Sequence, residues 1–111
     1  MNSTNMGKEA EKLVALRLKK LNHKILCMNW RTKWCEIDIV SKKKKTVYFT
    51  EVKYRNSDRW GTGFDYIGPK KIQQIQFAAE LWIADNDWTD DSMLLGAEVD
   101  SNGEISIIEI S

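Results

Sequence analysis

Two carboxylates and one lysine are the side chains of this chain best suited to chemistry. Asp38 lies in residues 35–40, where polar and apolar side chains alternate with the period of a half-buried strand. Glu51 and Lys53 lie in residues 46–54, which are rich in β-branched and aromatic side chains and also predict a strand. Only five residues separate the two segments, too few for a crossover connection, so we expect a hairpin.

The register of this hairpin decides which side chains meet. If the turn centres on Lys44–Lys45, Asp38 faces Glu51 and Glu36 faces Lys53. Directly opposed side chains have Cβ atoms about 4.5–5.5 Å apart, close enough for two carboxylates to hold one hard cation. The two-residue period of a strand places the second carboxylate and the lysine on one face and turns the intervening valine away.

These side chains suit phosphodiester hydrolysis. Mg²⁺ binds through one or two carboxylates and accepts a phosphate oxygen, and it lowers the pKa of a bound water. A neighbouring lysine can orient that water or stabilise charge on the phosphate. Acyl transfer fits less well, because His23 is the only histidine and no Ser–His or Cys–His arrangement is evident. The alternative is a solvated strand face with paired charges, although the row also contains Val47 and Phe49, and unpaired charges beside apolar residues are costly.

The spacing of these residues resembles the PD-(D/E)xK nuclease signature. The wider sequence is similar to the bacterial YraN family, whose fold resembles archaeal Holliday-junction resolvases. The matching stretches are Ala10-Glu11-Lys12-Leu13, Asn29-Trp30-Arg31, Cys35-Glu36-Ile37-Asp38, Thr50-Glu51-Val52-Lys53-Tyr54-Arg55 and Pro69-Lys70-Lys71. The resemblance runs from about Gly7 to Ala79 and weakens in the last third; Ala10 and Cys35 stand where the family usually has glycine.

The resemblance implies a restriction-endonuclease-like α/β fold and an endonuclease that uses Mg²⁺ or Mn²⁺ to cut structured or branched DNA. Asp38 and Glu51 would then bind the metal, with the carbonyl of Val52 as a third ligand. Lys53 would orient the water or stabilise the transition state. Glu11 would support the metal from the first helix; as a surface residue paired with Arg17 or Lys12 it would be purely structural.

Three cations are expected to hold backbone phosphates: Arg31, Arg55 and Lys71. Lys71 falls in the first turn of a predicted helix, where the dipole disfavours a cation but favours a phosphate. A lysine that snorkels from an apolar face is the alternative. A homodimer is a further expectation, because resolvase-like enzymes that cut two strands commonly need two sites.

Two other classes of function stay open. One is a nucleic-acid-binding module that keeps the fold but turns over slowly or not at all. The other is a structural protein whose acidic last third docks on another subunit. Cleavage that depends on Mg²⁺ separates the enzyme from both, and salt-sensitive DNA binding separates the second class from the third.

Length and composition set the remaining expectations. At 111 residues the chain should form a single nuclease-like domain, residues 1–111. No apolar run approaches the ~18 residues of a membrane span, and the first residues lack the layout of a signal peptide, so we expect a cytoplasmic protein with no membrane partner. Cys27 and Cys35 form no CxxC pair and are expected to be reduced thiols. His23 is expected on the surface, after the first helix.

Charge is distributed unevenly along the chain. Residues 1–71 contain all 17 Lys and Arg and 7 acidic residues, a net charge of +10, whereas residues 72–111 contain 9 acidic residues and no Lys or Arg. This division favours an anionic partner for the first part of the chain. The alternative is that the two parts simply neutralise one another within one small domain.

The periodicity predicts the element order αβββαββ in a mixed sheet with helices packed against it. The expected elements are a helix from Thr4 or Asn5 to Leu21, strands at Lys24–Asn29, 35–40 and 46–54, a helix at Pro69–Asp85, and strands at Met93–Val99 and Glu104–Ile110. Residues 55–68 are expected to form a loop. Trp34 and Trp60 lie in loops; stacking on exposed bases and packing over a core edge are both consistent with that, and we expect packing.

Overall fold

The computed structural model describes residues 3–55 and 68–110, and within them it is an α/β fold in the predicted order αβββαββ. The elements are α1 (Ser3–Lys20), β1 (Lys24–Arg31), β2 (Glu36–Lys43), β3 (Thr46–Tyr54), α2 (Pro69–Asp85), β4 (Asp91–Val99) and β5 (Ile105–Glu109). Residues 56–67 of the predicted loop, including Trp60, lie outside the described residues.

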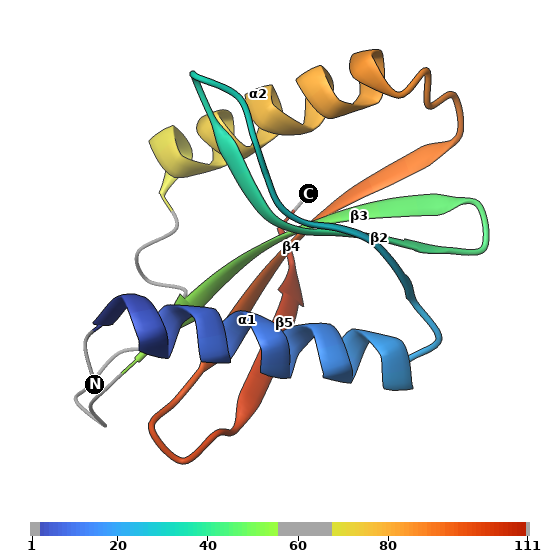
Figure 1. Cartoon of the computed structure of the whole chain (residues 1–111). Coiled ribbons are helices and arrows are strands. Elements are labelled where there is room, and N and C mark those ends of the chain that lie inside the picture. Colours follow the sequence, from blue (N-terminus) through green and yellow to red (C-terminus); the bar gives the residue numbers. More distant parts are fainter. Residues whose placement is uncertain (1–2, 56–67, 111) are drawn as a thin grey trace.

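The strands form one mixed sheet in the order β1-β2-β3-β4-β5. The first three strands pair antiparallel, β3 pairs with β4 in parallel, and β4 pairs antiparallel with β5. Because a parallel pair requires a crossover, the chain leaves the sheet after β3 and returns through α2. Figure 1 shows that α1 and α2 lie on opposite faces of the sheet.

The predicted hairpin register is confirmed. Lys43 pairs with Thr46, so the turn is Lys44–Lys45, and the ladder continues to Ile39 opposite Thr50. This register brings the next residues along, Asp38 and Glu51, to neighbouring positions on the two strands.

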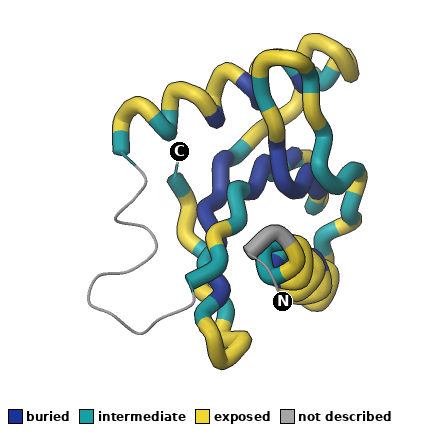
Figure 2. Tube along the Cα trace, turned by 60° about the vertical axis from the view of Figure 1, so that its left-hand side comes forward, coloured by how far each residue is buried: buried dark blue, intermediate teal, exposed yellow. Residues whose placement is uncertain are grey.

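Each face of the sheet has its own apolar core, and Figure 2 shows the buried residues concentrated in the strands between the two helices. On the α2 side, Val47 and Phe49 of β3 pack against Ala78, Ala79 and Trp82. On the α1 side, the buried residues are Ala10, Val14, Ala15, Leu18, Ile39, Leu95, Ala97 and Val99. The central strands therefore carry apolar residues on both faces and hold the site between two packed layers.

α1 ends at Lys20, one residue before the predicted Leu21, and the residues after it correct the prediction for His23. Asn22 has φ 73°, the left-handed conformation that ends a helix, and the N–H of His23 donates to the carbonyl of Leu18. His23 is half-buried and not on the surface as predicted: its Nδ1 lies 3.0 Å from the Ser41 hydroxyl and its ring contacts Tyr48. Burial and then the charge of a nearby lysine lower the pKa of His23.

Neither helix of the described residues is long and apolar enough to cross a lipid bilayer.

Two phenylalanines provide a matched test of the α2-side core. Phe49 is fully buried, whereas Phe77 on α2 is 47% exposed. We expect Phe49→Ala to lower the free energy of unfolding by about 3–5 kcal/mol, through lost burial and the cavity it leaves. The same change at Phe77 should cost less than about 1 kcal/mol. Urea unfolding followed by circular dichroism measures both, and equal losses would contradict this placement of the core.

Candidate active site

The site forms where β2 and β3 stop pairing. Ile37 packs on the α2 side and Ile39 on the α1 side, so the regular alternation of β2 is broken between them. The residue at the break is Asp38, whose carboxylate Oδ2 accepts the N–H of Val52 at 2.8 Å. A side chain thus takes a backbone donor of β3 just beyond the end of the β2–β3 ladder.

Asp38 is a buried carboxylate, only 8% exposed. Burial, and after it the negative charge of Glu51, raises the pKa of Asp38 from 3.8 to about 7. The N–H of Val52 opposes this shift, while Glu11 and Glu36 add to it. Three acidic side chains therefore act on one buried carboxylate, which is costly unless a cation neutralises the group.

Glu51 lies on the α2 side of β3, as the strand period predicted. Its Oε1 is 3.0 Å from Nζ of Lys71, in the first turns of α2. Both side chains line a cavity of about 290 Å³, together with Trp34, Cys35, Glu36, Gln74, Ile75 and Phe77. The predicted phosphate-binding lysine is therefore brought to the predicted metal ligand and forms an ion pair with it.

Glu36 and Arg31 pair with each other at the entrance to β2. Arg31 Nη2 lies 2.7 Å from Oε2 of Glu36, and both side chains are largely exposed. The sequence had placed Glu36 opposite Lys53, but the β2–β3 ladder ends before it reaches Glu36. The expected opposition is therefore not part of the sheet, because β2 diverges from β3 at Asp38.

Glu11 lies on α1, which covers the face of the sheet opposite Glu51. It is half-buried beside fully buried Ala10, and its charge contributes to the raised pKa of Asp38. The nearby Lys12 pairs instead with Glu9, at 3.5 Å. Lys12 therefore pairs with Glu9 among the described residues, and a role of Glu11 at the site stays a prediction beside the alternative of a surface pair with Arg17.

The other predicted residues follow along β3. The side chain of Val52 packs with the α1-side core, away from Glu51, as expected. Lys53 is exposed. The backbone N–H of Arg55 donates to the carbonyl of Val99 at 2.8 Å, which fixes the start of the segment after β3.

Glu98 is a carboxylate that the sequence analysis missed. In the parallel ladder its Cα pairs with Lys53, while Gly96 pairs with Glu51. Its Oε2 is buried and has no hydrogen-bond partner among the described residues. No local pattern could identify it, because the β3–β4 register is set by tertiary packing. Gly96 leaves the strand surface beside Glu51 without a side chain.

The donor set fits a hard divalent cation held mainly by carboxylate oxygen. Within residues 3–55 and 68–110, no three His, Cys, Asp or Glu side chains converge as a complete metal site. Asp38 and Glu51 supply two carboxylates, which matches the preference of Mg²⁺ for one or two carboxylates with water completing its shell. Burial and the charge of Glu51 raise the pKa of Asp38, and a bound cation would favour its ionised form.

Trp34 does not pack over a core edge as expected. It is 69% exposed and lines the same cavity as Glu51. The ammonium group of Lys33 lies 4.8 Å from the centre of its ring. An exposed indole with a cation over it presents a flat aromatic surface at the mouth of the site.

Comparison with known proteins places the chain among its relatives. The model of "Uncharacterised protein family UPF0102" matches residues 10–109. The chain belongs to this family. The match confirms the resemblance to the YraN family and extends it beyond Ala79, through the last third where the sequence motifs weaken.

Relatives within UPF0102 come from distant bacteria. The chain is 36% identical to a UPF0102 protein of Fusobacterium nucleatum over 90 residues, which cover 81% of this chain and 76% of that protein. It is 41% identical to one of Flavobacterium johnsoniae over 78 residues, covering 70% of this chain and 63% of that protein. A third, from Pseudomonas fluorescens, is 36% identical over 77 residues, covering 69% and 64%.

The buried carboxylate of this UPF0102 member predicts an unusual dependence of stability on pH. The pKa of Asp38 is raised from 3.8 to about 7 in the folded state, so folding is favoured when the group is protonated. This contribution is fully present below pH 3.8 and is lost as the pH rises towards 7. At about 1.4 kcal/mol per pKa unit, the loss amounts to several kcal/mol.

Asp38→Asn should remove that loss, because an amide keeps the acceptor for Val52 but carries no charge. Urea unfolding in EDTA at pH 4, 5.5 and 7.5 should therefore show the variant gaining stability relative to the parent protein as the pH rises. A difference between the two proteins that stays constant across this range would contradict the uncompensated burial of Asp38.

Proposed function

We propose that this UPF0102 protein is a divalent-metal-dependent endonuclease acting on structured or branched DNA. One observation carries the proposal: a buried carboxylate, Asp38, lies beside Glu51 at the point where two central strands separate, and its pKa is raised to about 7. Such a position is unfavourable for an isolated carboxylate and well suited to one that binds a cation.

The residues divide the work of phosphodiester hydrolysis. Asp38 and Glu51 would hold Mg²⁺ or Mn²⁺, and the backbone carbonyl of Val52 would add a third oxygen ligand. When bound, such an ion supplies Lewis acidity to the phosphate and to water. The N–H of Val52 fixes the Asp38 carboxylate, so the ligand is oriented before the substrate arrives.

Lys53 and Glu11 would act beside the ligands. Lys53 is exposed two residues beyond Glu51 on the same strand face, so its ammonium group can orient water or stabilise the negative charge that builds on the phosphate. Glu11 approaches from α1 and adds negative charge around Asp38, which strengthens attraction for a cation.

The surroundings of the cavity suit nucleic acid. Lys71 lines the cavity, Arg31 pairs with Glu36 in its wall, Arg55 follows β3, and each is proposed to hold a backbone phosphate. Trp34 offers an exposed ring on which a base can stack. Aromatic contacts of this kind favour unpaired bases, which occur at branches and strand ends.

One observation favours a second function, a nucleic-acid-binding module without turnover. Lys71 already neutralises Glu51 at 3.0 Å, so the ammonium group can stand in the place of a metal cation. In that case the carboxylates serve only to position Lys71 for a phosphate. Affinity for divalent metal separates the two functions, because only the nuclease requires it.

The metal ligands provide the direct test. Asp38→Asn and Glu51→Gln should each lower Mn²⁺ affinity at least about 10-fold, because each removes a charged oxygen ligand while keeping volume. Both should lower the cleavage rate by about 100-fold or more. Calorimetric titration with Mn²⁺ and a cleavage panel of branched, duplex and single-stranded DNA measure these effects, with exposed Glu9→Gln as the control.

Lys53→Ala serves as the contrast in the same experiment. It should retain Mn²⁺ affinity yet lose most of the cleavage rate, since its role lies in the transition state. Mn²⁺ binding that persists in both carboxylate variants would contradict the metal site, and binding of DNA without cleavage by the parent protein would favour the non-catalytic module.

Removing the charge of Lys71 should change the affinity for Mn²⁺ and the affinity for DNA in opposite directions. Lys71→Gln frees Glu51 and should raise Mn²⁺ affinity by up to about fivefold, since a partly exposed ion pair contributes up to ~1 kcal/mol. The same change should weaken DNA binding and make its log–log salt dependence shallower by about one. Titrations with Mn²⁺ and with DNA measure the two effects.

Lys70→Gln is the matched control, because it removes the same charge from the exposed neighbouring residue. Its Mn²⁺ affinity should stay at the parent value. If Lys71→Gln lowers both affinities together, the lysine is a structural support and does not compete with the metal.

A further inference from the structure

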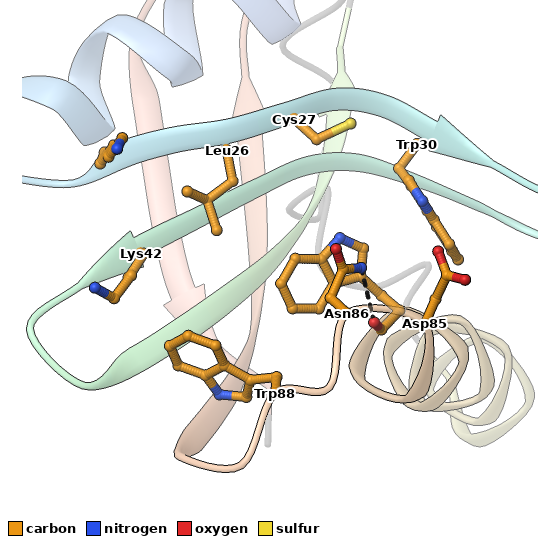
Figure 3. A pocket seen from close by; sticks show the side chains of 9 residues that line it. Leu26, Cys27, Trp30, Lys42, Asp85, Asn86 and Trp88 are labelled. Carbon is orange, nitrogen blue, oxygen red and sulfur yellow. Dashed lines mark hydrogen bonds between the residues drawn. The ribbon is translucent and has the colours of Figure 1, made fainter.

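A second and larger cavity lies on the α2 side of the sheet, at the far end of α2. Its volume is about 530 Å³, within the ~300–1,000 Å³ range of ligand sites. It is lined by residues from β1, the end of β2, the end of α2 and the following turn: Lys24, Leu26, Cys27, Trp30, Lys42, Trp82, Asp85, Asn86 and Trp88. We call it the tryptophan groove. Figure 3 shows Lys42 and Trp30 at opposite ends of it, with Trp88 across from β1.

Trp88, one aromatic wall of the groove, is held in place by hydrogen bonds to the backbone. After α2, Asp87 adopts φ 50°, and the N–H of Trp88 donates to the carbonyl of Ile83 at 3.0 Å. The indole N–H of Trp88 donates to the carbonyl of Asp91 at 2.9 Å. Because its polar atom is engaged outside the groove, Trp88 presents its ring as an apolar surface, fixed before any ligand binds.

The end of the groove away from Trp30 holds two lysines at paired positions on the neighbouring strands β1 and β2. Lys24 and Lys42 are Cα partners in the β1–β2 ladder, and both are exposed. Like charges at opposed positions are destabilising, and within the described part of the chain neither lysine has an ion-pair partner. An anion bound between them would relieve this repulsion, so the pair is complementary to a phosphate.

Aromatic side chains beside a cationic strip are the features that bind single-stranded nucleic acid. Bases stack on the rings whatever their sequence, and the lysines follow the backbone. The groove runs along β1 from Lys24 to Trp30, about 20 Å for six residues at ~3.3 Å each. This length exceeds that of one nucleotide. Asp85 at the tryptophan end disfavours phosphate there, which confines the phosphates to the lysine end.

We propose that the tryptophan groove binds an unpaired segment of a nucleic-acid strand, with bases on Trp30 and Trp88 and phosphates on Lys24 and Lys42. The inference deepens the proposed nuclease function and rests on it for the identity of the substrate. It implies that the substrate carries a single-stranded extension beyond the point of cleavage.

The position of the groove relative to the candidate active site supports this division. Lys71, which pairs with Glu51 of β3, lies at the start of α2, and Asp85 lies at its end, on the same side of the sheet. Fourteen residues of helix at about 1.5 Å each separate these positions by roughly 20 Å. A strand that occupies the groove would therefore meet the carboxylates of Asp38 and Glu51 several nucleotides further along its length.

Binding is tested in EDTA, where cleavage does not interfere. Fluorescence anisotropy with labelled 12-nucleotide DNA and RNA strands and a 12-base-pair duplex should show tighter binding of the single strands. Trp88→Ala should weaken single-strand binding about 5-fold or more. The double variant Lys24→Gln with Lys42→Gln should make the log–log salt slope shallower by about 1.4, since each phosphate contact contributes about 0.7.

The matched control is Lys19→Gln with Lys20→Gln, which removes the same charge from exposed positions on α1, across the sheet. It should bind the single strand as the parent protein does. The double lysine variant also keeps the test valid if Trp88→Ala fails to fold, because Lys24 and Lys42 are exposed.

Several outcomes would overturn the proposal: no preference for single strands, unchanged binding in both groove variants, equal losses in the α1 control, or AMP binding as tightly as the strand.

Asp38→Asn separates this inference from the nuclease proposal. If Asp38→Asn and the parent both bind the strand through the groove but neither cleaves, the groove stands and the nuclease proposal fails. If the parent cleaves and the groove variants bind the strand normally, the nuclease proposal stands and the groove proposal fails.

Discussion

The bond between the Asp38 carboxylate and the N–H of Val52 is the contact on which the site depends. It replaces strand pairing at the point where β2 separates from β3, so the sheet can open without leaving that donor of β3 unpaired. The separation creates room beside Glu51, and the same bond holds a buried carboxylate at its edge. Two apolar cores, one on each face, keep the strands in register up to this point and make the opening local.

The sequence was sufficient for those parts of the structure that depend on local rules. The turn at Lys44–Lys45 determines the register of β2 and β3, and this register brings Asp38 and Glu51 to neighbouring positions at the end of the ladder. Local rules cannot predict the position of Glu98 beside Lys53, because it follows from the pairing of strands far apart in the chain. They also do not foresee the break in alternation at Asp38, which arises from the packing of Ile37 and Ile39 on different faces.

Charge segregation along the chain does not survive as separate surfaces. β4, from the acidic part, lies beside β3, and Asp91 is the Cα partner of Thr46, next to the lysine-rich turn. Within α2 the two lysines at the start are followed by Asp85 at the end. Lys71 and the Lys24–Lys42 pair each line a cavity that also has tryptophan in its wall. Local arrangement decides where an anion can bind.

The mixed sheet also has a consequence for the order of folding. The β1–β2–β3 meander joins residues that are close in sequence, whereas the parallel pairing of Thr46 with Asp91 closes a long stretch of chain. Hairpins form within microseconds, while non-local strand pairs wait on slower loop closure. We expect Asp38 and Glu51 to meet early, before α2 docks and brings Lys71 to them. A divalent ion of the proposed kind that binds the half-folded hairpin would then act as a folding template.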